Sequence, residues 1–236
     1  MSKRLNKAKE MQFDDKTLLV FGDSIMNGSG NNDYGVGEYL SAQLGFKLIK
    51  RTVGGARVGY VPDKSWEVEQ VKDIIAEKIA PDYIVFDGFT NDCCIEFYPD
   101  KPDVPLGGLP VGYNAKKLKE ISKTDDFSTC FDAIIGALLG AFPHAKILFV
   151  RPHNMGRRDD LLQRQYGERA LDICKKWGVP YVDLYSESGM NTFLPEHRDL
   201  FTADSYGWGR GDCTHPNALG YETKYLPLIV AKLKTL

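Results

Sequence analysis

The chain has 236 residues, of which 43% are hydrophobic and 26% are charged, and its net charge is −2. This composition is typical of a globular protein with an ordinary hydrophobic core. The 30 basic residues are balanced by 32 acidic ones. That balance excludes the strongly basic surface with which proteins bind nucleic acid or anionic membranes, so we expect neither partner.

The beginning of the chain, residues 1–15, is polar and partly basic, and we expect it to form an N-terminal arm. It contains no apolar segment long enough for a signal peptide or a membrane span. The five cysteines show no spacing typical of zinc ligands and stand at positions 93, 94, 130, 174 and 213. We therefore expect reduced thiols, a cytoplasmic location and no metal, with export by another route left open.

Short apolar segments alternate along the chain with longer segments of helical periodicity. Strands are predicted at residues 17–21, 46–53, 83–86, 146–150 and 180–184, and helices at residues 37–44, 66–79, 127–142, 161–177 and 217–236. Continuously apolar strands indicate a sheet that is buried on both faces. The alternation predicts one α/β domain over residues 1–236, with a parallel sheet between helical layers.

One segment interrupts this alternation. Residues 96–126 are rich in proline and glycine, which predicts a long loop or a lid. Long loops in compact domains often serve binding or catalysis.

Polar and glycine-rich segments follow four of the predicted strands. They are residues 22–24, 54–55, 88–92 and 151–154. In open α/β sheets, ligands bind outside the carboxyl ends of the strands. We therefore expect these four segments to lie at one edge of the sheet, together with Asp212 and His215, which come just before the last predicted helix.

Ser24, Asp212 and His215 are the residue types of a nucleophile, an orienting carboxylate and a base. The backbone N–H of Gly55 and the amide of Asn91 are of the kind that stabilises an oxyanion. Each residue also has an ordinary structural explanation, as a helix cap or a turn former. Their joint occurrence, in order and at one edge, favours the catalytic interpretation.

This combination resembles the SGNH, or GDSL-type, hydrolase family. The resemblance rests on residues 22–24, Gly55, Gly88 with residues 91–92, and residues 212–221. It implies a flavodoxin-like three-layer α/β/α fold with strand order 2-1-3-4-5 and no metal or organic cofactor. It also implies roles for the site residues: Ser24 as nucleophile, His215 as base, Asp212 as its orienter, and an oxyanion hole formed by the Ser24 N–H, the Gly55 N–H and the Asn91 side chain.

Two positions depart from the family pattern. Lys50 stands where many members have an asparagine, so the hydrogen bonds that hold the second loop are expected to differ. The third segment, residues 88–92, is one residue longer than usual. Either Phe89 or Thr90 is inserted, or Gly88 is offset from the family glycine.

The expected activity is that of a serine esterase that hydrolyses short-chain acyl oxygen esters, with acetyl favoured. The long loop mixes aromatic and polar residues, which suits a sugar ring and favours a carbohydrate or other small-molecule ester. We expect substrate contacts from Asp23, Tyr98, His153 and Trp208. Lysophospholipase, thioesterase and acyltransferase activities use the same triad and stay open, as does a non-catalytic, ligand-binding flavodoxin-like domain. The oligomeric state is not predicted.

Overall fold

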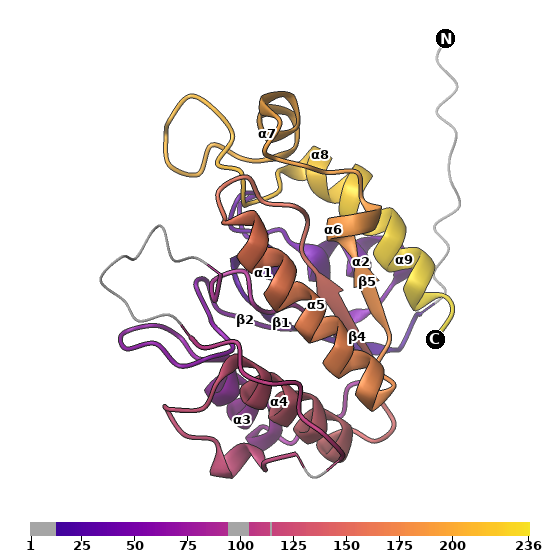
Figure 1. Ribbon diagram of the computed structural model, residues 1–236. Coiled ribbons are helices and arrows are strands. Elements are labelled where there is room, and N and C mark those ends of the chain that lie inside the picture. Colours follow the sequence, from indigo (N-terminus) through magenta and orange to yellow (C-terminus); the bar gives the residue numbers. More distant parts are fainter. Residues whose placement is uncertain (1–12, 94–103, 114) are drawn as a thin grey trace.

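The computed structural model describes residues 13–93, 104–113 and 115–236. A five-stranded parallel sheet forms its centre, in the order β2-β1-β3-β4-β5 (Figure 1). The strands are β1 (Thr17–Gly22), β2 (Lys47–Thr52), β3 (Tyr83–Phe86), β4 (Lys146–Arg151) and β5 (Tyr181–Asp183). All five predicted strands are therefore confirmed, as is their order.

The second strand differs from its prediction in one respect. We expected a buried strand over residues 46–53, but β2 is an edge strand whose residues are intermediate or exposed. It pairs with β1 alone, in a parallel register that places Leu19 beside Ile49. An edge strand has one side open to solvent, which explains why Lys47, Lys50 and Arg51 are accommodated there.

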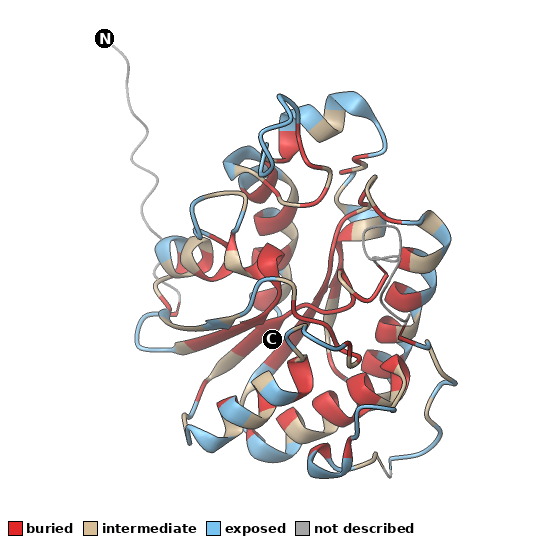
Figure 2. Ribbon diagram, turned by 90° about the vertical axis from the view of Figure 1, so that its left-hand side faces the viewer, coloured by how far each residue is buried: buried red, intermediate tan, exposed pale blue. Residues whose placement is uncertain are grey.

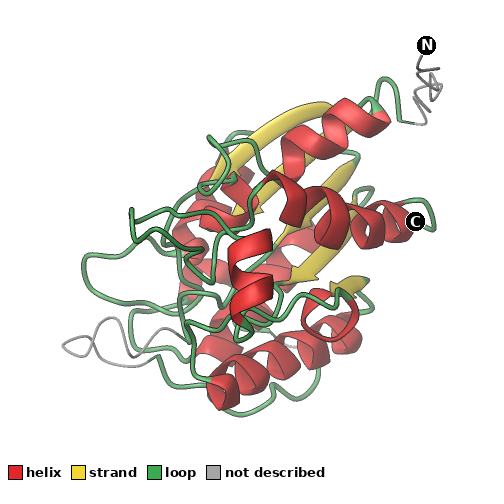
Figure 3. Cartoon of the chain, turned by 90° about the horizontal axis from the view of Figure 1, so that it is seen from above, coloured by secondary structure: helices red, strands yellow, loops and turns green. Residues whose placement is uncertain are grey.

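Helices cover both faces of the sheet (Figure 3). One face packs against α3 (Glu67–Ala76), α4 (Phe127–Ala141) and α5 (Asp160–Trp177). The other packs against α1 (Ser24–Asn27), α2 (Val36–Leu44) and α9 (Leu226–Leu233). The predicted three-layer α/β/α fold is thus confirmed.

The last predicted helix, over residues 217–236, is broken into three parts. One turn of α-helix, α8 (Ala218–Gly220), leads into a π-helical turn, η3 (Tyr221–Tyr225), and then into α9. Pro227 lies in the first turn of α9, where its missing N–H is tolerated. Other short helices of the described residues lie outside the predicted helix ranges: α1, η2 (Leu118–Glu120), α6 (Leu184–Glu187) and α7 (Pro195–Phe201).

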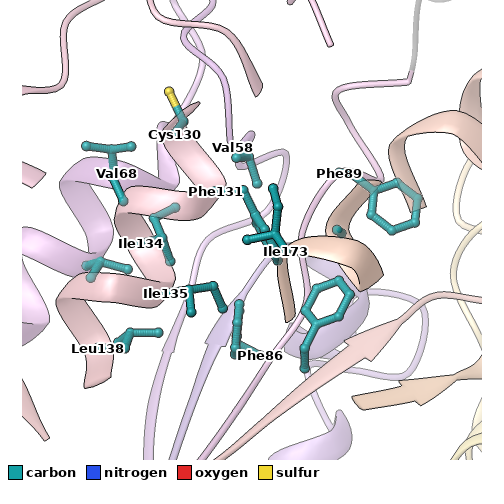
Figure 4. Packing of buried hydrophobic residues seen from close by; sticks show 14 of the residues in the cluster. Val58, Val68, Phe86, Phe89, Cys130, Phe131, Ile134, Ile135, Leu138 and Ile173 are labelled. Atoms are coloured by element: carbon teal, nitrogen blue, oxygen red, sulfur yellow. The ribbon is translucent and has the colours of Figure 1, made fainter. Parts of the chain in front are cut away.

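The alternation of side chains along the strands divides the core in two. Leu19 and Phe86 lie in the cluster beneath α3, α4 and α5, while Leu18 and Val85 lie in the cluster beneath α2 and α9. Figure 4 shows part of the first cluster, including Phe86 and Phe131, and Figure 2 shows the buried sheet between helices whose outer sides are exposed. Burial on both faces is the reason why the central strands are apolar throughout.

The described part of the predicted long loop packs against the helices. The hydroxyl of Tyr166 donates to the carbonyl of Val104, and the N–H of Phe127 donates to the carbonyl of Pro105 at 2.8 Å. Residues 94–103 and residues 1–12 of the predicted arm lie outside the described residues. A lid function and the single-domain organisation stay predictions.

Candidate active site

Ser24 is the first residue of α1, directly after β1. The turn that carries it depends on Gly22, which has a φ of +123° and where a side chain would clash with the carboxyl group of Asp87. Asp23 caps α1, because its Oδ1 accepts the N–H of Ile25 at 2.7 Å. The end of the strand and the beginning of the helix therefore fix the position of Ser24.

Three side chains that are far apart in the sequence meet at this turn. The Oγ of Ser24 lies 3.0 Å from Nε2 of His215, and Nδ1 of His215 lies 2.6 Å from Oδ2 of Asp212. Oδ1 of Asp212 also accepts the N–H groups of Thr214 at 2.9 Å and of His215 at 2.8 Å. The structure thus brings together the serine, the imidazole and the carboxylate that the sequence pattern singled out.

The electrostatics of Asp212 determine the tautomer of this histidine. Burial raises the pKa of Asp212, but the hydrogen bond and the charge of His215 act in the opposite direction and leave it below its ordinary value. An ionised Asp212 can only accept a hydrogen bond, so the proton of His215 lies on Nδ1 and Nε2 is left as the acceptor that faces Ser24. In this arrangement the imidazole is placed to take the proton of the Ser24 hydroxyl.

The loop after β2 approaches Ser24 from the neighbouring strand. A Cβ atom at Gly54 would lie 4.0 Å from Cβ of Ser24, whereas one at Gly55 would meet nothing within 4 Å. Gly55 has a φ of +76°, in the left-handed region that favours glycine. Within the described part of the chain, the N–H groups of Ser24 and Gly55 donate no hydrogen bond.

Asn91 lies next to these groups, on the segment after β3. Its Nδ2 donates to the carbonyl of Ala56 at 2.9 Å and to Oδ2 of Asp23 at 3.2 Å. Its amide is therefore already hydrogen-bonded inside the protein and holds the loop of Gly55 against the turn of Ser24.

The extra residue of this third segment has a structural explanation. The left-handed conformation falls on Phe89, at a φ of +76°, and not on Gly88. A non-glycine residue in that conformation is unusual. Of the alternatives left open by the sequence, this geometry favours the one in which Gly88 is offset and Phe89 occupies the position of the family glycine. Gly88 itself leaves room for Val58 and the carboxyl group of Glu67.

Lys50, the other departure from the family pattern, holds the loop that follows α1. Its Nζ donates to the carbonyls of Asn27 at 2.8 Å and Asp33 at 2.6 Å, and to Oε1 of Glu38 at 2.8 Å. The hydroxyl of Thr52, two residues further along β2, donates to the side chain of Asn27 at 2.8 Å. In this chain β2 therefore supports the first loop of the site directly.

A cluster of buried acidic residues behind Ser24 and Asn91 was not predicted. Asp87 accepts the N–H of Asp23 at 3.0 Å, and Asp92 accepts the N–H groups of Val58 and Gly59 at 3.0 and 2.8 Å. Glu67 is fully buried, and neither of its carboxyl oxygens has a partner among the described residues. Asp92 was part of the family resemblance and Asp87 directly follows an apolar strand, whereas Glu67 is an ordinary residue in a helical pattern.

Burial raises the pKa of each carboxyl group in this cluster. It raises the pKa of Asp92 to about 6, although the N–H groups of Val58 and Gly59 lower it in part. It raises the pKa of Glu67 and that of Asp87 well above their ordinary values, with the neighbouring carboxyl groups adding to the shift. Burial also raises the pKa of Asp23. Burial therefore favours the protonated form of each of these carboxyl groups.

The residues expected to contact substrate differ in their exposure. Asp23 and His153 are fully buried, and their contact with substrate stays a prediction. His153 lies with Nδ1 2.6 Å from the hydroxyl of Tyr225, and burial lowers its pKa to about 3, which keeps it neutral. The side chain of Trp208 is 46% exposed and its contact stays a prediction, while Tyr98 lies outside the described residues.

The described residues also bear on metal binding and on membrane insertion. In this part of the chain, no group of three or more histidine, cysteine or acidic side chains is arranged to hold a metal ion. None of its helices is both long and apolar enough to cross a membrane.

Solved structures resemble this fold along nearly its whole length. One is 27% identical with a TM-score of 0.69, covering 93% of this chain and 96% of its own. A GDSL-like lipase structure from Bacteroides ovatus is 16% identical, with a TM-score of 0.58 and coverage of 94% and 99%. A catalytic mutant of Axe2, an acetylxylan esterase from Geobacillus stearothermophilus, is 20% identical, with a TM-score of 0.56 and coverage of 92% and 94%.

The sequence model of the GDSL-like Lipase/Acylhydrolase family matches residues 20–223. This chain belongs to that family and is a hydrolase of the GDSL type. A curated relative, an inosose dehydratase from Histophilus somni, is 29% identical over 102 residues. The match covers 43% of this chain and only 32% of that relative, so the chain spans about a third of its length.

Proposed function

We propose that this hydrolase is a serine esterase that removes a short acyl group, preferably acetyl, from an oxygen ester. The observation that carries the proposal is the hydrogen-bonded chain from Ser24 Oγ through His215 to Asp212, with distances of 3.0 and 2.6 Å. A serine activated in this way is the nucleophile of acyl transfer.

In the proposed mechanism, the Oγ of Ser24 attacks the ester carbonyl while Nε2 of His215 takes its proton. The oxyanion receives the N–H groups of Ser24 and Gly55, and the amide of Asn91 joins them by exchanging one of its present acceptors. The tetrahedral intermediate then collapses, and His215 gives its proton to the departing alcohol. Water attacks the acyl-enzyme with His215 as base, which releases the acid and restores Ser24.

The choice of a carbohydrate ester rests on the residues that flank the site. Tyr206 and Trp208 are about half exposed and stack on each other at 4.7 Å, and the ring of Tyr206 lies 6.5 Å from that of His215. Exposed aromatic rings beside a reactive serine suit the apolar face of a sugar. The fold shared with an acetylxylan esterase is consistent with this choice.

The test compares Ser24→Ala with the wild type in the hydrolysis of p-nitrophenyl acetate. We expect kcat/KM to fall by roughly 10⁴-fold or more, because no other group in the triad replaces the nucleophile. Ser65→Ala, at an exposed serine, is the matched control and should keep its activity. Equal rates in Ser24→Ala and in the wild type would contradict the assignment.

The alternative functions have distinct outcomes. A fluorophosphonate probe labels an activated serine, so a folded protein that stays unlabelled at Ser24 would favour a non-catalytic binding domain. Product analysis with added sugars or alcohols separates hydrolysis from acyl transfer. A panel of acyl esters and thioesters of increasing chain length separates the acetylesterase from a lysophospholipase or thioesterase.

A further inference from the structure

The backbone of Cys213, between Asp212 and His215, has an unusual conformation. Its φ is +67°, in the left-handed region, which is sterically unfavourable for a residue with a side chain. Cys213 lies inside the turn over which Oδ1 of Asp212 accepts the N–H groups of Thr214 and His215. Such a conformation persists where neighbouring groups hold it in place, and it is typical of functional sites.

The two ends of this turn are anchored to one residue. The N–H of Asp212 donates to the carbonyl of Ala203 at 2.8 Å, and the N–H of Ala203 donates to the carbonyl of His215 at 2.9 Å. Because both ends are fixed, the loss of a hydrogen bond inside the turn should change its conformation locally without unfolding the chain. The orientation of His215 therefore depends on what holds Cys213.

Two buried threonines hold Cys213, one on each side. The hydroxyl of Thr192 donates to the carbonyl of Cys213 at 2.7 Å, and the hydroxyl of Thr202 accepts the N–H of Cys213 at 3.2 Å. The exposed fractions of these threonines are only 2% and 3%. His153 lies near the carbonyl of Cys213, but its Nε2 has no hydrogen-bond partner among the described residues. Thr192 is therefore the side chain that holds this carbonyl.

The hydroxyl of Thr192 is itself fixed by the segment that follows β4. It accepts the N–H of Gly156 at 2.8 Å, and the N–H of Thr192 donates to the carbonyl of Asn154 at 3.0 Å. That carbonyl lies 3.2 Å from the hydroxyl, so the shorter contact with Cys213 is the better use of its single proton. The hydroxyl thus links the segment after β4 to the turn that carries the catalytic histidine.

We propose that Thr192 is a positioning residue of the catalytic triad, because its hydroxyl holds Cys213 in the left-handed conformation that places His215 against Ser24. Thr192 acts through the backbone of Cys213 and not through a hydrogen bond to a triad side chain. This inference rests on the proposed esterase function and adds to it a residue outside the triad on which the position of the base depends.

The first experiment removes the hydroxyl and then restores it. Thr192→Val keeps the shape of the side chain but takes the hydroxyl donor from the carbonyl of Cys213. We expect kcat for p-nitrophenyl acetate to fall by roughly 10- to 100-fold and KM to change by less than about twofold, because a displaced imidazole slows proton transfer but leaves ground-state binding intact. Thr192→Ser restores the hydroxyl and should stay within about threefold of the wild type.

Thr223→Val is the matched control. Its hydroxyl also donates to a backbone carbonyl, that of Leu219 at 2.6 Å, but it is exposed on η3. This variant should keep its activity. A loss in Thr192→Ser as large as that in Thr192→Val, or no loss in Thr192→Val, would contradict the proposal.

A second pair of variants separates the control of backbone conformation from a general loss of packing. Cys213→Gly allows a φ near that of Cys213 without steric cost, so the hydroxyl of Thr192 is no longer needed to hold the turn. Adding Thr192→Val to Cys213→Gly should lower kcat by less than about threefold, compared with roughly 10- to 100-fold in the wild-type background. Equal losses in the two backgrounds would overturn the inference.

Amide hydrogen exchange tests the same role without any substrate. In the full chain, Thr192→Val should speed the exchange of the amides of Cys213, Thr214 and His215 by about tenfold, while Thr192→Ser and Thr223→Val should not. Unchanged exchange in β4 shows that the variants stay folded. If the wild type hydrolysed no ester, the esterase proposal would fail, but this measurement would still decide whether Thr192 holds the turn. Exchange in Thr192→Val equal to that of the wild type would refute that role whether or not Ser24 is catalytic.

Discussion

Asp212 and the acidic cluster behind Ser24 are both shielded from water, but the pKa values of their carboxyl groups are shifted in opposite directions. Asp212 is fully buried and accepts two backbone N–H groups and the imidazole of His215, and its pKa is lowered. Glu67 is equally buried and has no partner among the described residues, and burial raises its pKa well above its ordinary value. Asp92, with two N–H donors, lies between them with a pKa of about 6.

The comparison shows that the hydrogen bond and the charge of His215 outweigh burial at Asp212, whereas burial dominates at Glu67. The ionised Asp212 orients the imidazole. In the cluster behind Asn91, the raised pKa values of Glu67 and Asp87 disfavour negative charge that would oppose the developing oxyanion. Negative charge is therefore favoured at Asp212, next to the imidazole of His215.

The largest effect expected from this comparison follows from removing the charge of Asp212. Asp212→Asn keeps the shape of the side chain but replaces the carboxylate with an amide. Either the NH₂ group or the uncharged oxygen of that amide then faces His215, and the Nδ1–H tautomer of His215 is no longer favoured. We expect kcat/KM for p-nitrophenyl acetate to fall by roughly 10³- to 10⁴-fold. Asp172→Asn, at an exposed aspartate paired with Lys175, is the control. If Asp212→Asn and Asp172→Asn were equally active, the charge of Asp212 would have no part in catalysis.

A smaller loss of activity is expected from replacing Asn91, which lies between the acidic cluster and the loop of Gly55. Asn91 donates to Asp23 of the acidic cluster and to the carbonyl of Ala56 beside Gly55. Asn91→Ala should lower kcat by roughly 100- to 1000-fold and change KM little, as loss of an oxyanion donor does. Labelling of Ser24 by a fluorophosphonate should continue at a reduced rate. A loss of less than about threefold in kcat would restrict the role of Asn91 to holding the loop.

The sequence was sufficient to predict the position of site residues that directly follow a strand. Ser24 and Asn91 follow apolar strands, and the order of a parallel α/β sheet brings such positions to one edge. The same rule placed His215 there, because it precedes the last helical segment. These predictions needed only local patterns and the general topology.

Other features depended on contacts that no local pattern contains. Glu67 is one polar residue in an amphipathic helical segment, and only the folded chain shows that it points inward beneath Gly88. Lys50 can donate hydrogen bonds to the loop after α1 and to Glu38 because β2 is an edge strand with room for a long side chain. The burial of His153 likewise follows from the packing of Tyr225, more than seventy residues away in the sequence.

The smallest effect on activity is expected from Glu67→Gln. This variant tests whether the raised pKa of Glu67 makes the stability of the protein depend on pH. The raised pKa of Glu67 means that its carboxyl group ionises more readily in the unfolded chain than in the folded one. As pH rises above about 4, the unfolded state loses this proton first, and wild-type stability falls by at most about 1.4 kcal/mol per pH unit from this group. Glutamine does not ionise, so the stability of the variant should not fall with pH on account of this residue.

Urea unfolding between about pH 4 and about pH 8 measures the difference. The free energy of unfolding of Glu67→Gln, minus that of the wild type, should grow as pH rises, while kcat/KM stays within about threefold because Glu67 does not touch Ser24 or His215. Glu69→Gln, at an exposed residue of the same helix, should show no such growth. A difference that stays constant with pH would mean that Glu67 is ionised in the folded protein, and burial without donors would then not suffice to keep a carboxyl group neutral here.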